Sequence, residues 1–224
     1  MIGMIFHTRT IENKDWATIL FIVALALIAL TKSFFENRFA DFIKLIVSDK
    51  YIKIYKDSSH LWSGFTIALF LVQIMSLAFF IQLILHYFGY VSKNDWVVFT
   101  QLATFLAFFI LSKYLLEKII ATAFNMEEFI EQFNLQKLSY RTYAGLLILP
   151  IDIILFYNCN LSRSFLIVLI GAILTLNVLT YIISLKNYQN ILFGKMFYFI
   201  LYLCALEIAP YYFIYYWFTK KLAH

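Results

Sequence analysis

The chain has few of the residues that soluble proteins use for turns, cross-links and solvation. Its 224 residues include two cysteines, two prolines, six glycines and four histidines, and only 14% of them are charged. Soluble globular proteins carry about 25% charged residues, so this composition excludes an ordinary soluble domain. The cysteines, Cys159 and Cys204, stand in different settings and predict no disulfide framework.

Signatures of catalysis and metal binding are also missing from the sequence. It contains no GxSxG, P-loop or GxGxxG motif. None of the four histidines stands four residues from another, the spacing of a helical metal site. We therefore assign no catalytic residue, cofactor, metal ligand or small-molecule substrate, and we expect the chain not to be an enzyme.

The chain is instead rich in apolar sequence, with 63% hydrophobic residues and a mean hydropathy of +0.81. Its apolar runs have the length of membrane-spanning helices and lack the alternating pattern of a membrane barrel. We expect an all-α, polytopic transmembrane bundle forming one integral-membrane domain over 1–224, with the first run retained rather than cleaved. The six predicted spans are 16–31, 61–88, 96–116, 138–157, 164–185 and 196–218.

The distribution of basic residues predicts the orientation, because loops rich in Lys and Arg stay on the cytoplasmic side. The first, third and fifth connections, with the span ends beside them, hold twelve of the 18 basic residues. Both termini are therefore expected to face away from the cytoplasm. Nucleic acid is not an expected partner, because the most basic connection, 32–57, has six basic residues against four acidic ones.

The first connection contains an amphipathic pattern at the spacing of one helical face. Apolar residues recur at positions 35, 39, 42, 43 and 46, while basic residues lie elsewhere. One interpretation is an interfacial helix whose basic side meets anionic lipid, and the other is a helix packed on the spans. Both alternatives stay open. The residues of this predicted interfacial helix are Phe35, Arg38, Phe39, Phe42, Lys44 and Ile46.

A second cytoplasmic element is predicted before the fourth span. Asn125 is a suitable N-cap, and Glu127 and Glu128 follow in the first turn, where carboxylates complement the helix dipole. Near the inner end of the third span, Lys113 and Glu117 stand four residues apart, which is the spacing of a structural ion pair.

Two carboxylates interrupt the predicted spans, each close to a proline. Glu207 precedes Pro210 in the sixth span, and Asp152 follows Pro150 in the fourth. Each proline removes a backbone donor and favours a kink. Counted from the cytoplasmic ends of their spans, both acids should lie about 16 Å deep, so they could meet.

Two amides belong to a similar level of the membrane, Gln73 in the second span and Asn177 in the fifth. Together with Asp152 and Glu207 they form a predicted intramembrane polar layer. Such a layer either bonds helices together through neutral acids and amides or conducts protons on carboxylates. The first interpretation is favoured because no Lys, Arg or His lies at that depth, and a lone buried carboxylate normally stays protonated.

Three segments together resemble an uncharacterised family of small polytopic inner-membrane proteins of Bacteroidota, classed as a domain of unknown function. They are SKYLLEKIIATAFNMEE, KLSYRTYAGLLILP and FYFILYLCALEIAPYYFIYY, in this order. The resemblance covers most of the chain, and LCALEIAP is its most specific part. It implies a bacterial inner membrane, and it carries no activity or catalytic residue. With the orientation that the basic residues predict, both termini are then expected in the periplasm.

These features lead to a hypothesis of a non-catalytic subunit or scaffold of a larger envelope assembly, in protein translocation or secretion. Its expected partners are the lipid bilayer and other inner-membrane proteins. The alternative from another class is a small proton-coupled carrier that uses Asp152 and Glu207. A weaker alternative is a lipid-modifying membrane enzyme.

Overall fold

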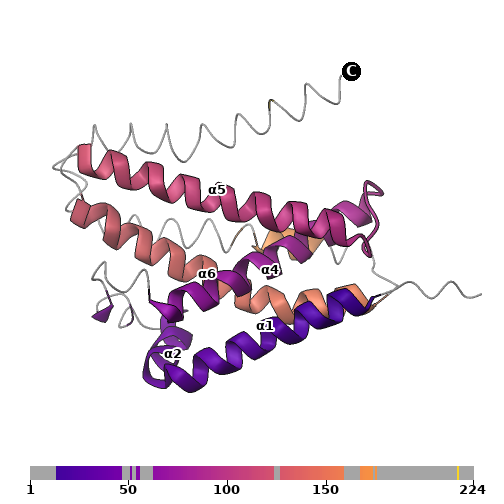
Figure 1. Ribbon diagram of the computed structural model, residues 1–224, viewed down its shortest axis with the longest axis horizontal. Helices are drawn as coiled ribbons and strands as arrows, with labels where there is room; N and C mark the ends of the chain where they lie inside the picture. Colours follow the sequence, from indigo (N-terminus) through magenta and orange to yellow (C-terminus); the bar gives the residue numbers. More distant parts are fainter. Residues whose placement is uncertain are drawn as a thin grey trace, which may run out of the picture.

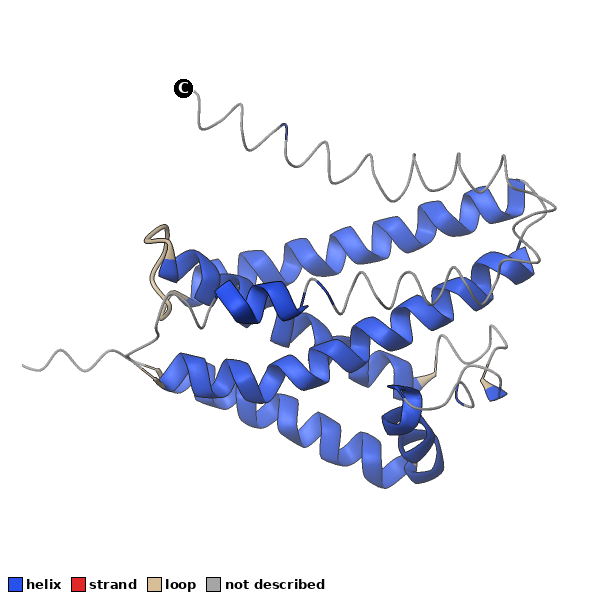
Figure 2. Cartoon of the chain, turned by 180° about the vertical axis from the view of Figure 1, so that it is seen from behind, coloured by secondary structure: helices blue, strands red, loops and turns tan. Residues whose placement is uncertain are grey.

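The computed structural model describes residues 14–46, 51, 54–55, 63–123, 127–158, 167–173, 175 and 216. Within these ranges every regular element is helical and there is no strand, as Figure 2 shows, so the all-α prediction is confirmed for this part of the chain. The elements are α1 (Asp15–Phe34), α2 (Glu36–Ile43), the 3-10 turn η1 (Lys44–Ile46), α4 (Gly64–Tyr87), α5 (Trp96–Ala123) and α6 (Glu127–Tyr157).

Four of these helices are long and apolar enough to cross a membrane. They are α1, α4, α5 and the part of α6 from Ile130 to Tyr157. They correspond to the first four predicted spans. Of the two other predicted spans, 164–185 and 196–218, only residues 167–173, 175 and 216 are among those described, and these are helical.

The third and fourth spans are longer than predicted. Helix α5 continues to Ala123, seven residues beyond its predicted end, and α6 begins at Glu127, so the predicted cytoplasmic element and the fourth span form one helix of 31 residues. At about 1.5 Å per residue, α6 extends about 46 Å, well beyond a hydrocarbon core of about 30 Å. The charged residues between 113 and 141 did not end the helices, because Lys and Glu are good helix formers.

Two of the described helices, α4 and α5, begin at capping side chains. Ser63 precedes α4, and its hydroxyl accepts a bond from the Thr66 backbone N–H at 3.4 Å. Asp95 precedes α5, and its Oδ1 accepts a bond from the Val97 N–H at 3.0 Å. Both caps supply an acceptor for backbone donors that have no partner within the first turn.

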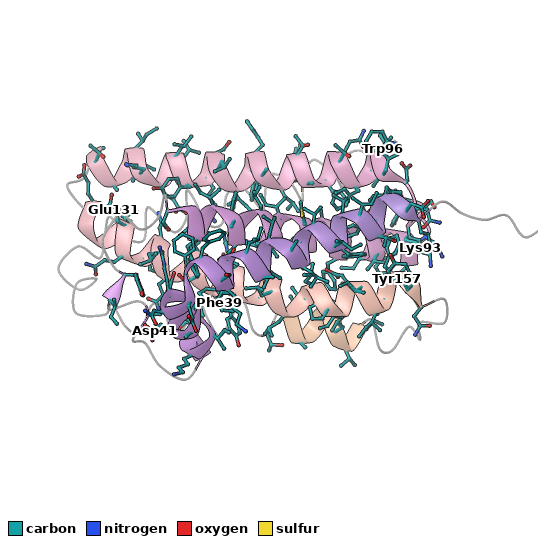
Figure 3. All side chains as sticks on the ribbon, turned by 60° about the horizontal axis from the view of Figure 1, so that its bottom comes forward. Phe39, Asp41, Lys93, Trp96, Glu131 and Tyr157 are labelled. Atoms are coloured by element: carbon teal, nitrogen blue, oxygen red, sulfur yellow. The ribbon has the colours of Figure 1, made fainter. Side chains whose placement is uncertain are left out.

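The four long helices run in alternating directions along the chain (Figure 1). At one end, called here the loop end, the Trp16 indole N–H donates to the carbonyl of Asn94 at 3.2 Å, and Lys93 Nζ donates to the carbonyl of Phe156 at 3.4 Å. At the other end, called the α2 end, α2 lies beside the start of α4. Figure 3 shows Trp96, Lys93 and Tyr157 at the loop end, with Phe39, Asp41 and Glu131 towards the α2 end.

Helix α4 lies at the centre of the bundle and contacts α1, α5 and α6. In its most apolar stretch 56% of the residues are buried, against 11% in α5. Towards the loop end, Phe79 of α4 stacks on Phe21 of α1 at a centroid distance of 4.2 Å and contacts Phe99 of α5 in a tilted arrangement at 4.4 Å. This aromatic cluster joins helices that are far apart in the sequence.

The predicted interfacial helix packs on the spans through its inner face. Phe39 and Phe42 are buried in a cluster with Phe65 and Leu69 of α4, and Leu45 is buried with them. The structure thus supports the alternative in which this face of the helix packs on the membrane spans.

Two other details of the predicted helix are corrected. Phe35, which was expected to be buried, is 39% exposed, and Ile43, which was placed on the same apolar face, is 52% exposed. The α-helix also ends at Ile43, and the turn Lys44–Ile46 has 3-10 geometry. A 3-10 turn has about three residues per turn, so Leu45, three residues after Phe42, takes the inward position.

Candidate functional site

Polar side chains of α4 and α6 face each other inside the bundle. On α4, Gln73 and Ser76 are three residues apart and therefore share a face. On α6, Thr142 and Asp152 belong to the buried side of the helix, with Gly145 between them. These five residues define what we call the α4–α6 polar interface.

The first contact of this interface surrounds Gln73, which is 1% exposed. The Thr142 hydroxyl donates to Gln73 Oε1 at 2.9 Å. A Cβ atom on Gly145 would lie 3.0 Å from the Cα of Gln73, so the two helix backbones approach as closely as a glycine allows. Close approach through a small residue is typical of helix packing in membranes.

The second contact surrounds Asp152, which is fully buried. The Ser76 hydroxyl donates to Asp152 Oδ2 at 3.0 Å. Among the described residues, Asp152 Oδ1 and Gln73 Nε2 have no hydrogen-bond partner, and no ion pair involves Asp152. The carboxyl group is therefore joined to α4 by a single hydroxyl and not by a cation.

The structure brings two members of the predicted polar layer, Gln73 and Asp152, to one helix interface. Gln73 bonds to Thr142, which lies ten residues before Asp152, or about 15 Å along the helix. Gln73 and Asp152 therefore share one helix interface but bond to different partners. Glu207, Asn177 and Pro210 lie outside the described residues.

Pro150 lies inside α6 with its ring on the exposed side, and the helix continues to Tyr157. Its missing N–H leaves the carbonyl of Leu146 without the usual helical donor. Pro150 thus points away from the α4–α6 polar interface, two residues before Asp152.

Ser76, Thr142 and Gly145 were not identified from the sequence, although each contributes to the interface. Their signal was present in the spacing: Ser76 stands three residues after Gln73, and Gly145 three residues after Thr142. Small and hydroxylated residues on one helical face favour interhelical contacts. The sequence alone does not say which two faces meet.

A second polar group, the basic cavity, lies between α4, α5 and α6 towards the α2 end. Lys137 Nζ of α6 forms an ion pair with Glu117 Oε1 of α5 at 3.0 Å. The sequence predicted Lys113 as the partner of Glu117, whereas this bond joins two helices. A cavity of about 120 Å³ lies beside the pair, and its walls include Lys113, Asn134 and Arg141.

Arg38 was expected on the basic, lipid-facing side of its helix, and the structure corrects this placement. The side chain is 7% exposed, and its Nη1 donates to Ser63 Oγ at 2.6 Å. Its guanidinium group also lies over the rings of Phe65 and Tyr55, at 4.5 and 4.9 Å from their centroids. Arg38 turns inward because these aromatic faces and hydroxyl groups together satisfy a planar cation.

Tyr51 lies beside Arg38, outside the long helices. Burial raises the pKa of the Tyr51 hydroxyl above its usual value, and the nearby positive charge of Arg38 opposes this shift. Lys44, the other basic residue of the predicted interfacial helix, is exposed, and the Ile46 side chain lies outside the described part. Arg38 and Tyr51 therefore attach the first connection to the start of α4.

The described ranges contain no group of three or more His, Cys, Asp or Glu side chains that could hold a metal ion. The contacts shown in the two polar regions are hydrogen bonds and an ion pair between helices.

Long apolar helices joined by buried polar side chains define a multi-helix bundle of the type that crosses membranes. The chain belongs to the family described as "Domain of unknown function (DUF4271)", which it matches over residues 17–218. The resemblance to an uncharacterised domain family is therefore confirmed, while its bacterial phylum stays a prediction. No curated protein and no solved structure matches the chain.

Proposed function

We propose that the chain is a non-catalytic, multi-spanning subunit of a bacterial inner-membrane assembly, in protein translocation or secretion. The observation that carries this proposal is the bonding of Asp152. Its carboxyl group is fully buried and accepts a bond from Ser76 of the neighbouring helix. Asp152 lines neither of two cavities bounded by described residues, so its role is to join α4 to α6.

Helix α5 supports a role in assembly. It is mostly exposed within the described part of the chain, and its outer side carries Phe105, Phe108, Leu115 and Ile119, with Phe108 72% exposed. An apolar helix face of this kind is covered by lipid or by another membrane protein. A subunit needs such a face for its partners.

The alternative is a proton-coupled carrier, and one observation favours it. Asp152 Oδ1 and Gln73 Nε2 are buried polar atoms without partners among the described residues. A mobile proton would bind to Asp152 Oδ1, and a second acid such as Glu207 would accept a bond from Gln73 Nε2. Under this alternative the amide variants of the acids lose function.

The proposed orientation places the α2 end in the cytoplasm. The described part of the chain contains nine Lys and Arg residues. Seven of them lie in the half of the bundle that contains the α2 end and the basic cavity, and the other two, Lys14 and Lys93, lie at the loop end. This asymmetry agrees with cytoplasmic retention of basic segments. A C-terminal alkaline phosphatase fusion should be active, and an inactive fusion beside an active cytoplasmic reporter would contradict the orientation.

The function is tested by replacing the acids while measuring both activity and assembly. Asp152→Asn and Glu207→Gln keep shape and hydrogen-bonding capacity, so we expect complementation of a deletion strain at normal protein abundance. The exposed acid Glu36 provides a matched control, Glu36→Gln. Loss of complementation by Asp152→Asn, with normal abundance and a normal control, would favour the carrier.

The subunit hypothesis also predicts stable partners. Purification of the tagged full chain from native membranes in mild detergent should recover the same proteins at constant stoichiometry from wild type and from Asp152→Asn. Recovery of the chain alone, at an abundance sufficient for detection of partners, would remove the support for a subunit.

A further inference from the structure

A second, smaller cavity lies where α2, α4 and α6 meet the first connection. Its volume is about 10 Å³. Four residues of its wall carry hydroxyl groups: Tyr51, Thr66, Ser139 and Thr142. The other described residues of the wall are apolar: Phe42, Phe65, Leu69, Leu135 and Leu138. We call this space the hydroxyl cavity.

Three of the four hydroxyl groups belong to side chains that are almost fully buried. Tyr51, Ser139 and Thr142 are 2%, 6% and 5% exposed. They come from two separate parts of the chain, because Tyr51 belongs to the first connection and the other two belong to α6. Buried polar groups in proteins nearly always have hydrogen-bond partners, so the bonds of each hydroxyl group can be counted.

The two hydroxyl groups of α6 already donate their protons. The Ser139 hydroxyl donates to the carbonyl of Leu135 at 2.7 Å, and the Thr142 hydroxyl donates to Gln73 Oε1 at 2.9 Å. A hydroxyl group has one proton and two lone pairs. Both oxygens can therefore still accept a hydrogen bond, and neither can donate a second one.

The Tyr51 hydroxyl is in the opposite situation. Its oxygen accepts a bond from Arg38 Nη2 at 3.4 Å. Within the described part of the chain no acceptor receives the Tyr51 proton, and no hydrogen bond joins Tyr51 directly to Ser139 or Thr142. One donor and two acceptors thus line the same small space without bonding to each other.

A single water molecule matches this set of groups. It would accept one bond and donate two, and about three hydrogen bonds are typical of a buried water. A volume of about 10 Å³ is also close to the space that one water molecule requires. An organic ligand is larger than this space.

Ions match the hydroxyl cavity less well. The described wall contains no carboxylate, and Arg38 bonds to two of its residues, Tyr51 and Thr66, so a cation would meet positive charge. An anion needs donors. Ser139 and Thr142 donate their protons to other groups, so they offer an anion none.

We propose that the hydroxyl cavity binds one structural water molecule, which accepts a bond from Tyr51 and donates to Ser139 and Thr142. This water attaches the first connection to α6. It also extends the α4–α6 polar interface towards the α2 end, through a chain of hydrogen bonds from Arg38 to Tyr51, the water, Thr142 and Gln73. The site does not depend on partner proteins, so its test is separate from that of the proposed function.

A crystal structure of the full chain in lipid tests the position of the water. We expect density within about 3.2 Å of the hydroxyl oxygens of Tyr51, Ser139 and Thr142. An empty cavity, in a map that shows other buried waters, would overturn the proposal. An anomalous signal at this position after soaking with bromide would overturn it as well, because it would indicate an anion.

A double-mutant cycle with Tyr51→Phe and Thr142→Val tests the bridge in solution. Each replacement removes a hydroxyl group and keeps the shape of the side chain. Because both variants lose the same water, the double variant should be more stable than additive losses predict, on the order of two- to fivefold in the unfolding equilibrium constant. Thermal unfolding in detergent measures this coupling.

Thr122→Val is the matched control for this cycle. The Thr122 hydroxyl is exposed and donates to the carbonyl of Lys118 in its own helix at 3.2 Å. Its combination with Tyr51→Phe should therefore be additive, and Thr142→Ser in place of Thr142→Val should remove most of the coupling because it keeps a hydroxyl group. Additive losses for Tyr51→Phe with Thr142→Val, or an equal coupling in the control pair, would contradict a bridging water.

Discussion

The α4–α6 polar interface and the basic cavity join the same helix, α6, to its neighbours in different ways. At the first, short side chains and Gly145 bring two backbones close together, and the hydrogen bonds involve Thr142 with Gln73 and Ser76 with Asp152. At the second, long charged side chains lie between α5 and α6 beside a cavity of about 120 Å³. Small polar residues thus join two helices at close approach, whereas the longer charged residues join two helices beside a cavity.

The largest loss of stability is expected when the close approach of α4 and α6 at Gly145 is broken. A side chain at Gly145 would begin 3.0 Å from the Cα of Gln73, a backbone atom that cannot move aside alone. Gly145→Leu should lower the free energy of unfolding by about 3 kcal/mol or more, the upper range for overpacking. Thermal unfolding of the purified protein in detergent measures this loss.

Gly171 provides the matched control for this prediction. It also lies in a helical segment, but a Cβ atom placed on it meets nothing within 4 Å. Gly171→Leu should therefore leave the unfolding temperature nearly unchanged. Equal destabilisation by the two leucine variants would show that the approach of α4 and α6 is not specific to Gly145.

The next effect concerns the carboxyl group of the same interface. Asp152→Leu removes the acceptor of Ser76 and should cost about 1 to 2 kcal/mol, because a buried hydroxyl loses its partner. Asp152→Asn keeps an oxygen acceptor and should cost much less. Unfolding in detergent compares the two, and equal losses would mean that shape rather than hydrogen bonding decides the contact.

The ion pair between Glu117 and Lys137 should contribute less to stability than the contact of Asp152. A double-mutant cycle with Glu117→Gln and Lys137→Gln should give a coupling energy of about 1 kcal/mol, which is typical of contacting residues. Their side chains are 4% and 10% exposed, so the pair is partly protected from screening by salt. A coupling energy near zero would show that Lys137 and Glu117 act independently.

The smallest effect is expected for Thr142→Val, which removes the donor to Gln73 Oε1 while keeping the shape of the side chain. Interhelical hydrogen bonds in membranes contribute about 0.6 kcal/mol on average, and we expect a loss of that size. The unfolding temperature of this variant should lie between those of wild type and Asp152→Leu. A larger loss of stability than in Asp152→Leu would show that the contact of Thr142 with Gln73 contributes more than the contact of Ser76 with Asp152.

The extent of the fold that was predictable differs between the two regions. Asp152 and Gln73 were identified as polar residues in spans, because a single polar side chain is conspicuous in an apolar run. Their partners, Ser76 and Thr142, were not, since short hydroxylated residues are common in apolar helices. Lys113 was matched to Glu117 from its spacing, whereas the structure joins Glu117 to Lys137 of another helix.

In the first connection, too, the sequence predicted positions on a helix but not the partners of a side chain. Its apolar positions 39 and 42 were correctly placed on one face, and both side chains are buried. Arg38 was assigned to the outer face from its charge, yet the rings of Phe65 and Tyr55 and the hydroxyl of Ser63 hold it inside. A helical pattern describes angles around one helix and contains no information on which aromatic faces will cover a cation.

The sequence by itself determined that the chain is helical, that its helices are long and apolar enough to cross a membrane, and that acids interrupt them. These properties follow from local composition and from the period of the helix, which residues close in the sequence decide. Only the tertiary structure decided that Ser76 bonds to Asp152, that Gly145 packs on Gln73 and that Lys137 reaches Glu117. Those contacts depend on the rotation and crossing of whole helices, which are set when several faces pack at once.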